Sequence, residues 1–198
     1  LMPTKIDLRS AIYLTGLAFI WGSSFFFAAI ALQEVPPITL TLFRVILAIP
    51  LLALIIWFRG ESLPRETKVW GSYIVMGTLN NAIPFSLIFW GQTQITSGLS
   101  SILNGATGVT GVIVAGIMLK DERLFPHKVI GVIIGFLGVI VTLGVDTLQS
   151  FNILSLGQFA ILLAGLSYSF AGVWAHLRLA GQSAEMNAFG MLICSCIL

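Results

Sequence analysis

Charged side chains are scarce in this sequence. Of its 198 residues only 9% are Asp, Glu, Lys or Arg, whereas soluble domains carry about 25%. Hydrophobic residues make up 57% of the chain, and its mean hydropathy is +1.00. This balance excludes an ordinary soluble domain and predicts an integral membrane protein.

Residues that carry catalytic or metal chemistry are also few. The two histidines, His127 and His176, fall at the ends of predicted helices, and neither has a second histidine or cysteine at metal-ligand spacing in the sequence. Cys194 and Cys196 are two positions apart, which places them on different faces of a helix. The sequence therefore predicts no cofactor and no metal site, and a membrane-embedded enzyme is the weaker class. The net charge of +2 gives no reason to expect nucleic-acid binding.

Apolar residues form blocks of about 20, the length at which a helix crosses a hydrocarbon layer roughly 30 Å thick. The stretch "VIGVIIGFLGVIVTLG" (129–144) shows none of the alternation that barrel strands need. We therefore predict an all-α integral membrane helical bundle. A seventh span should begin near Asn187 and break off at Leu198, so we expect the chain to be truncated. The six complete spans are predicted at 11–32, 37–58, 69–93, 98–119, 127–146 and 155–177.

The basic residues at or beyond the ends of the predicted spans all fall on one side of the predicted membrane. The opposite loops, 33–36, 94–97 and 147–154, contain no lysine or arginine. By the positive-inside bias the N-terminus is cytoplasmic, and we expect a multi-pass protein of the plasma membrane. These basic residues are Lys5, Arg9, Arg59, Arg65, Lys68, Lys120, Arg123, Lys128 and Arg178.

A short internal repeat is visible when the chain is compared with itself. "GLAFIWGSSF" (16–25) matches "GLSYSFAGVW" (165–174) in its glycine, leucine, aromatic and small positions. Five spans separate the two copies, and an odd number reverses orientation across the membrane. The match predicts a five-plus-five inverted repeat in a protein of about 300 residues. Residues 11–146 would form the first five-helix repeat, and 155–198 the start of an incomplete second one.

Several motifs, in this order and spacing, resemble the EamA-type branch of the drug/metabolite transporter superfamily. They are "WGSSF" (21–25), "PPITLTLFRVILA" (36–48), "NNAIPFSLIFWGQTQITSGLSSILN" (80–104), "LKDERL" (119–124) and "GVIIGFLGVIV" (131–141). The resemblance implies ten helices in two inverted repeats and transport of small metabolites, often export. One departure is visible in span four. Where the family usually has a proline, this chain reads "NGATGVTG" (104–111), with Gly108.

The tenth basic residue, Arg44, lies inside predicted span two, about 10 Å below its outer end. Arginine near mid-membrane costs roughly 2.5–3.5 kcal/mol on insertion scales, so we expect it to face the bundle interior. No carboxylate lies in the central part of any span. Two interpretations remain open: Arg44 holds helices together through backbone carbonyls, or it binds a substrate anion.

Span three provides further candidate binding residues. Pro84 lacks a backbone N–H, so the carbonyl of Asn80 loses its helical hydrogen bond and becomes a free acceptor. Asn80, Pro84 and Gly91 share one helical face, and Trp90 lies near the outer end. This face could line a substrate cavity. The alternative is a proline kink in which Asn80 or Asn81 bonds across the bundle.

Aromatic and hydroxyl residues of the matched repeat segments form a second candidate set. Trp21 and Ser24 in span one would form one wall of a cavity. The repeat-matched segment in span six would form the opposite wall, with Tyr168 and Trp174. Such aromatics either enclose an organic solute or fill the core. Asn104, with Thr107 at helical spacing in span four, either contacts the ligand or stabilises helix packing.

Two backbone features predict packing and bending. Gly131, Gly135 and Gly138 form a small-residue face in span five, which indicates close internal packing or a homodimer contact. Pro50 should bend span two by freeing the carbonyl of Ile46.

We therefore predict a secondary transporter that moves small polar or amphipathic metabolites by alternating access, with export favoured. Amino acids and related carboxylates suit Arg44 better than cationic drugs, because a buried cation repels them. The partners would be this small-molecule substrate and the lipid bilayer. A non-transporting accessory membrane protein is the main alternative, but it should have apolar interior faces. A channel is a further class, although no filter-like loop is present.

Overall fold

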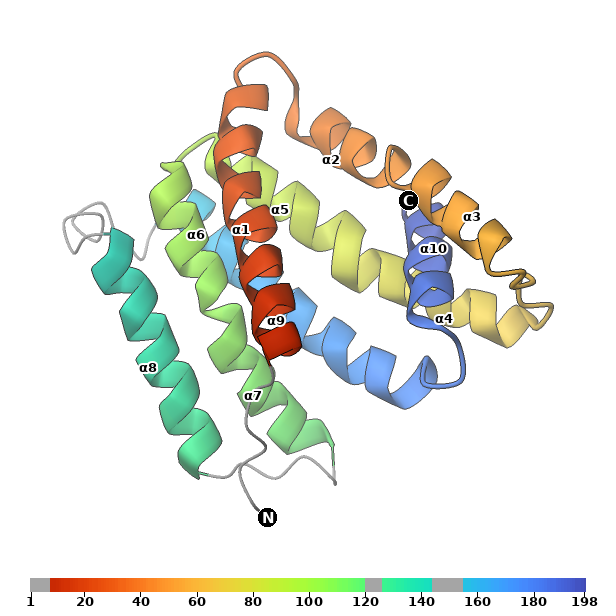
Figure 1. Ribbon diagram of the computed structural model, residues 1–198. Coiled ribbons are helices and arrows are strands. Elements are labelled where there is room, and N and C mark those ends of the chain that lie inside the picture. Colours follow the sequence, from red (N-terminus) through yellow and green to blue (C-terminus); the bar gives the residue numbers. More distant parts are fainter. Residues whose placement is uncertain (1–7, 120–125, 144–154) are drawn as a thin grey trace.

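The computed structural model describes residues 8–119, 126–143 and 155–198. Within these ranges the chain contains helices and their connections but no strand (Figure 1). The prediction of an all-helical bundle is confirmed for this part of the chain.

Five helical segments of the described chain are long and apolar enough to cross a membrane. Two are continuous: α1 (Leu8–Ala31) and α9 (Leu156–Arg178). The other three are interrupted. They consist of α2 (Pro37–Ile46) with α3 (Ile49–Phe58), α4 (Thr67–Gly77) with the π-helix η1 (Thr78–Ala82) and α5 (Ile83–Gln92), and α6 (Ser97–Gly105) with α7 (Thr107–Met118).

Two further helices correspond to the remaining predicted spans. Helix α8 (Pro126–Leu143) qualifies only as a shorter apolar helix over Pro126–Gly138. Helix α10 (Ala184–Ser195) begins close to the expected seventh start. The count of six complete spans therefore stays a prediction, as does the inverted repeat. The predicted boundary between the repeats, 146–155, lies outside the described residues except for Ser155.

Prolines account for two of the helix interruptions. Span two is interrupted between Ile46 and Ile49, and Pro50 occupies the first turn of α3, at the place where the sequence predicts a bend. In span three, Pro84 follows η1, in which the N–H of Ile83 bonds to the carbonyl of Thr78. This five-residue step is a π-helix, and it accommodates the donor that proline lacks.

Helix α9 lies at the centre of the described bundle, with α5 and α7 as its main neighbours (Figure 1). In its apolar window 56% of the residues are buried, against 6% for α1. Helices α5 and α9 approach closely at two glycines, because a Cβ on Gly91 would lie 2.8 Å from the carbonyl oxygen of Gly157. Small residues at this crossing let the two backbones meet.

Helix α10 packs against α3, α4 and η1. At Gly77 of α4, an added Cβ would lie 2.7 Å from the backbone oxygen of Met191. At Gly190 the ring of Tyr73 occupies the space where a side chain would stand. Glycines on both helices thus allow α10 to seat closely against α4.

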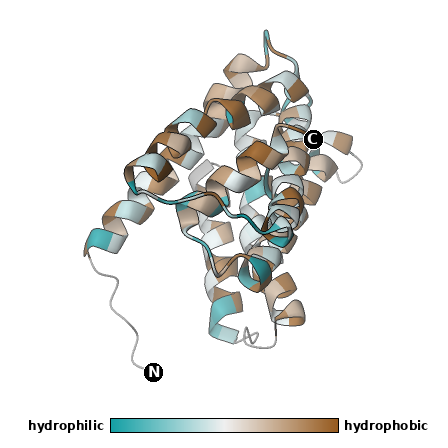
Figure 2. Ribbon diagram, turned by 90° about the vertical axis from the view of Figure 1, so that its right-hand side faces the viewer, coloured by the Kyte–Doolittle hydropathy of each residue, from teal (hydrophilic) through white to brown (hydrophobic). Residues whose placement is uncertain are grey.

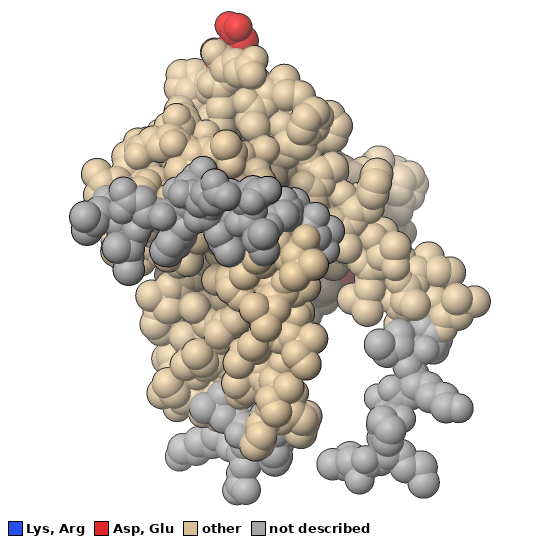
Figure 3. All heavy atoms as spheres, turned by 90° about the vertical axis from the view of Figure 1, so that its left-hand side faces the viewer, with Lys and Arg blue, Asp and Glu red and all other residues tan. Residues whose placement is uncertain are grey.

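The outer surface is largely apolar, as a bilayer requires. Brown residues predominate along the helices in Figure 2, and teal residues gather in connecting loops and at helix ends. The face drawn in Figure 3 is almost free of charged side chains over its described part. Large hydrophobic side chains such as Phe19, Ile134 and Trp57 are more than 60% exposed. Together with the five candidate spans, this surface identifies a multi-pass membrane protein.

Candidate functional site

Arg44 points from the last turn of α2 onto aromatic rings of α5. Its guanidinium carbon lies 4.4 Å from the centroid of the Phe85 ring and 5.8 Å from that of Phe89. The side chain is only partly buried. Within the described ranges no hydrogen bond and no ion pair reaches it, so its contacts there are cation–π interactions.

Tyr168 of α9 completes this aromatic cluster. Its ring meets the Phe85 ring edge to face, with centroids 6.5 Å apart, and Phe85 also stacks on Phe89 at 6.3 Å. Phe85 thus contacts both the guanidinium of Arg44 and the ring of Tyr168. We call Arg44, Phe85, Phe89 and Tyr168 the arginine–aromatic cluster. It joins helices α2, α5 and α9, and it brings together two of the predicted binding residues, Arg44 and Tyr168.

The π-helix lies directly before this cluster and determines which way α5 faces. A π-turn contains an extra residue, so the helix after it is rotated relative to a continuous α-helix. The carbonyl of Leu79 in η1 accepts a hydrogen bond of 2.7 Å from Ser167 of α9. Pro84, a predicted site residue, is buried. It lies in the first turn of α5, directly before Phe85.

The asparagines of η1 contact α10. Asn81 is 2% exposed, and its amide donates a 3.0 Å hydrogen bond to the hydroxyl of Ser195. Asn80 donates weakly to the side-chain oxygen of Asn81 at 3.5 Å and to the sulfur of Met191 at 3.7 Å. The alternative in which an asparagine bonds across the bundle is thus realised by Asn81.

A second polar group lies where α6 ends and α7 begins. The side-chain oxygens of Asn104 and Thr107 are buried, and neither has a hydrogen-bond partner among the described residues. A Cβ on Gly165 of α9 would lie 2.8 Å from the Thr107 hydroxyl. One turn further, the hydroxyls of Thr110 and Ser169 are 2.8 Å apart. Polar groups therefore occur where α6 and α7 meet α9, and two of their buried oxygens, on Asn104 and Thr107, have no partner in the described chain.

The remaining predicted site residues lie elsewhere. Trp21 is 64% exposed on α1, and the hydroxyl of Ser24 bonds to its carbonyl at 2.7 Å. Trp90, at the end of α5, is 40% exposed. The indole of Trp174 donates to the backbone oxygen of Ser72 at 3.2 Å and lies 5.6 Å from the guanidinium of Arg178. The structure places none of these four in the arginine–aromatic cluster.

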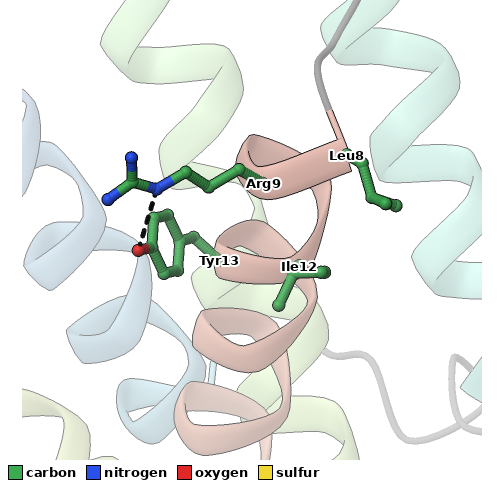
Figure 4. A pocket seen from close by; sticks show the side chains of 4 residues that line it. All are labelled: Leu8, Arg9, Ile12 and Tyr13. Carbon is green, nitrogen blue, oxygen red and sulfur yellow. Dashed lines mark hydrogen bonds between the residues drawn. The ribbon is translucent and has the colours of Figure 1, made fainter.

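A pocket lies at the N-terminal end of α1 and is lined by Leu8, Arg9, Ile12 and Tyr13. Figure 4 shows Arg9 folded toward Tyr13, and its Nε donates a 3.1 Å hydrogen bond to the phenolic oxygen. All four residues come from two turns of one helix. The pocket is therefore an open surface hollow, and it contains none of the predicted binding residues.

Phe85 and Phe89 were not among the site residues predicted from the sequence. They are four residues apart, so they share one helical face, and Phe85 follows Pro84 directly. The available signal was Arg44 itself. A membrane arginine without a carboxylate needs another electron-rich partner, and aromatic faces provide one.

Comparison with known proteins places the chain in a family. The EamA-like transporter family model matches residues 8–144. The uncharacterized transporter YoaV of Bacillus subtilis is 22% identical over 178 residues, which cover 89% of this chain and 61% of that protein. An uncharacterized transporter of Archaeoglobus fulgidus is 31% identical over 134 residues, 67% of this chain and 45% of that protein. Protein PagO of Salmonella typhimurium is 28% identical over 132 residues, 66% and 42% of the two chains.

The chain spans about two fifths to three fifths of the length of these relatives. No solved structure matches it. Members of the matched family are transporters rather than enzymes. The family model covers well over half of the chain, and the motifs that resemble the EamA type fall within or beside the matched residues. The protein therefore belongs to the EamA-like transporter family.

Proposed function

We propose that this protein is a secondary transporter of the plasma membrane that exports small polar or amphipathic metabolites by alternating access. Family membership supports the transport of a solute, and the interrupted helices supply places where spans can bend. Amino acids and related carboxylates are the proposed substrates. The two inverted five-helix repeats and a cytoplasmic N-terminus form part of the same proposal.

The observation that supports this substrate class is how Arg44 is held. The guanidinium carbon of Arg44 lies 4.4 Å from the centroid of the Phe85 ring. A cation–π contact uses no hydrogen-bond acceptor, and no hydrogen bond from Arg44 is present among the described residues, so its N–H donors stay available to a ligand. A carboxylate could bind them in a bidentate manner. The cation is thus stabilised in the apolar span without using the donors that a substrate would need.

The aromatic members of the arginine–aromatic cluster would suit the same ligand. Tyr168 of α9 packs edge to face against Phe85, the ring that the Arg44 guanidinium contacts. The aromatic rings would contact the apolar part of an amphipathic solute. The remaining proposed contacts, to be reached in other states of the transport cycle, are Asn80, Pro84, Asn104, Trp21, Ser24, Trp90 and Trp174.

Transport assays in proteoliposomes test the proposal with the full-length protein. The panel should contain neutral amino acids, dicarboxylates and organic cations. We expect flux of amino acids or carboxylates, whereas flux of organic cations alone would contradict the substrate class. No flux of any solute would support a non-transporting accessory protein instead.

An Arg44→Ala variant tests the proposed binding residue. We expect normal insertion but loss of most transport, because the carboxylate would lose its bidentate partner. Arg65→Ala is the matched control, since Arg65 is an exposed arginine outside the spans. If Arg44→Ala reaches the membrane at the normal level and keeps normal flux, Arg44 only packs helices.

Orientation and oligomeric state need separate measurements. Epitope tags at the N-terminus should be accessible only from the cytoplasmic side. A homodimer through the glycine face of α8 stays a prediction, and light scattering in detergent would test it. In the described chain a Cβ on Gly131 or Gly135 would meet nothing within 4 Å.

A further inference from the structure

A polar cluster joins the end of α3 to the start of α10. The guanidinium of Arg59 lies 2.8 Å from a carboxylate oxygen of Glu185 and 3.7 Å from one of Glu61. The hydroxyl of Ser183 donates a 2.5 Å hydrogen bond to the other oxygen of Glu61. These four residues come from the two predicted cytoplasmic ends of spans two and seven.

Both helix ends are shaped to present these groups. Helix α3 ends in a Schellman motif, in which Gly60 has a φ of +65° and the N–H of Glu61 bonds to the carbonyl of Ile56. The N-cap of helix α10 is Ser183, whose hydroxyl accepts a hydrogen bond from the N–H of Met186. The carboxylates of Glu61 and Glu185 thus lie at the positive end of α10, where they are favourable.

An apolar seam lies beneath the polar cluster. Ile56 of α3 packs against Met186 and Phe189 of α10, and all three are buried. In a bilayer, separating two apolar helix faces exposes them to lipid rather than to water, so such a seam resists separation only weakly. The polar contacts at its end therefore add to the preference for the closed arrangement.

The opposite end of α10 is held differently. Ser195 accepts from the buried amide of Asn81 and donates to the carbonyl oxygens of Met191, at 2.6 Å, and Gly77, at 3.2 Å. This contact lies within the bundle, away from the loop ends. A movement of α10 about this inner contact would separate its first turn from α3.

The ion pairs of the polar cluster can also separate. The side chains of Arg59, Glu61 and Glu185 are 52%, 28% and 30% exposed, so water can solvate them once they part. Pairs of this exposure shift an equilibrium by about five-fold at most. That bias is small enough for substrate binding to overcome.

We propose that Arg59, Glu61, Ser183 and Glu185 form a latch, which holds α3 and α10 together at the cytoplasmic face and is released when the transporter opens to that side. This proposal rests on the alternating-access function proposed above. The latch is a conformational device and not a substrate site.

Accessibility of the seam beneath the latch tests the proposal. Phe189→Cys is introduced after Cys194→Ala and Cys196→Ala, which remove the chain's two native thiols. A membrane-impermeant maleimide is then applied from the cytoplasmic side of inside-out vesicles. Arg59→Glu and Glu185→Arg should each raise the labelling rate up to about five-fold, because like charges then face each other.

Charge reversal at both positions supplies the decisive comparison. Arg59→Glu with Glu185→Arg restores an opposite-charge pair, so the labelling rate should return toward that of the parent. Arg65→Glu, which reverses an exposed charge in the same loop, should leave the rate unchanged. A second reporter, Ile56→Cys, replaces Phe189→Cys if that variant fails to fold.

Unchanged labelling in both single variants would overturn the latch. So would a double variant that labels as fast as the faster single one. The labelling needs no substrate, so the proposed function can fail separately. The double variant could restore the labelling rate of the parent while the protein moves no solute. That result would support the contact between α3 and α10 and contradict the proposed transport.

Discussion

The guanidinium carbon of Arg44 on α2 lies 4.4 Å from the ring centroid of Phe85 on α5. This contact places the positive charge of a membrane span against a ring face instead of a carboxylate. It also fixes the relative rotation of α2 and α5, because both side chains must face each other. The cluster around it, with Phe89 and Tyr168, connects three helices through aromatic packing.

Phe85→Leu should weaken both the fold and transport. Leucine keeps the apolar contact but loses the cation–π interaction, which contributes about 0.5–2 kcal/mol. We expect a lower melting temperature in detergent and reduced flux. Phe85→Tyr, which keeps the aromatic face, is the control and should retain both. A leucine variant with the flux and stability of the parent would show that the ring does not hold Arg44.

Gly157→Ala should destabilise the α5–α9 crossing. The new Cβ would lie 2.9 Å from the Cβ of Gln94 and 3.2 Å from the carbonyl oxygen of Gly91. Overpacking of this kind costs about 1–3 kcal/mol. Gly172→Ala on the same helix is the control, since its Cβ would meet nothing within 4 Å. Thermal unfolding in detergent measures both, and equal melting temperatures would argue against the close crossing.

Asn104→Leu distinguishes a ligand contact from a packing role. The buried oxygen of Asn104 has no hydrogen-bond partner in the described chain, so its removal should leave stability unchanged or raise it. If this oxygen binds substrate, flux falls while the melting temperature holds. Thr107→Val, which removes the neighbouring unpartnered hydroxyl, provides the matched comparison. A variant with lower stability and unchanged flux would assign Asn104 to packing.

The bond between Asn81 and Ser195 can be measured by a double-mutant cycle. Asn81→Ala and Ser195→Ala are compared singly and together by unfolding in detergent or mixed micelles. Interhelical hydrogen bonds in membranes average about 0.6 kcal/mol and reach about 1.7. We expect a coupling energy in the upper part of this range, because Asn81 is only 2% exposed. Additive effects would mean that the 3.0 Å contact contributes nothing.

The helices could be predicted closely from hydropathy and length. Predicted span three, 69–93, corresponds to Thr67–Gln92, and span six, 155–177, to Leu156–Arg178. The reason is physical: in lipid every backbone group must be satisfied within the segment, so an apolar block of this length has few conformations available. Pro50 also marked its break correctly, because the missing N–H acts locally.

The site was only partly predictable. Arg44 stands out in the sequence because its charge is costly in an apolar span. Phe85 and Phe89 do not, because an aromatic ring facing lipid and one facing a cation look alike in a sequence. The latch residues were equally hidden, since Glu61 and Glu185 read as ordinary loop and helix-end charges.

The amino-acid sequence by itself determined that this protein spans a membrane, where its helices lie and that one cation must be accommodated inside. These properties follow from the cost of charge and of unsatisfied backbone groups in hydrocarbon, which acts on each segment separately. Only the tertiary structure decided which partners meet that cation and which helix ends are joined. Those choices depend on helix rotation, on the π-turn at Thr78–Ala82 and on close glycine contacts, which bring together residues far apart in the chain.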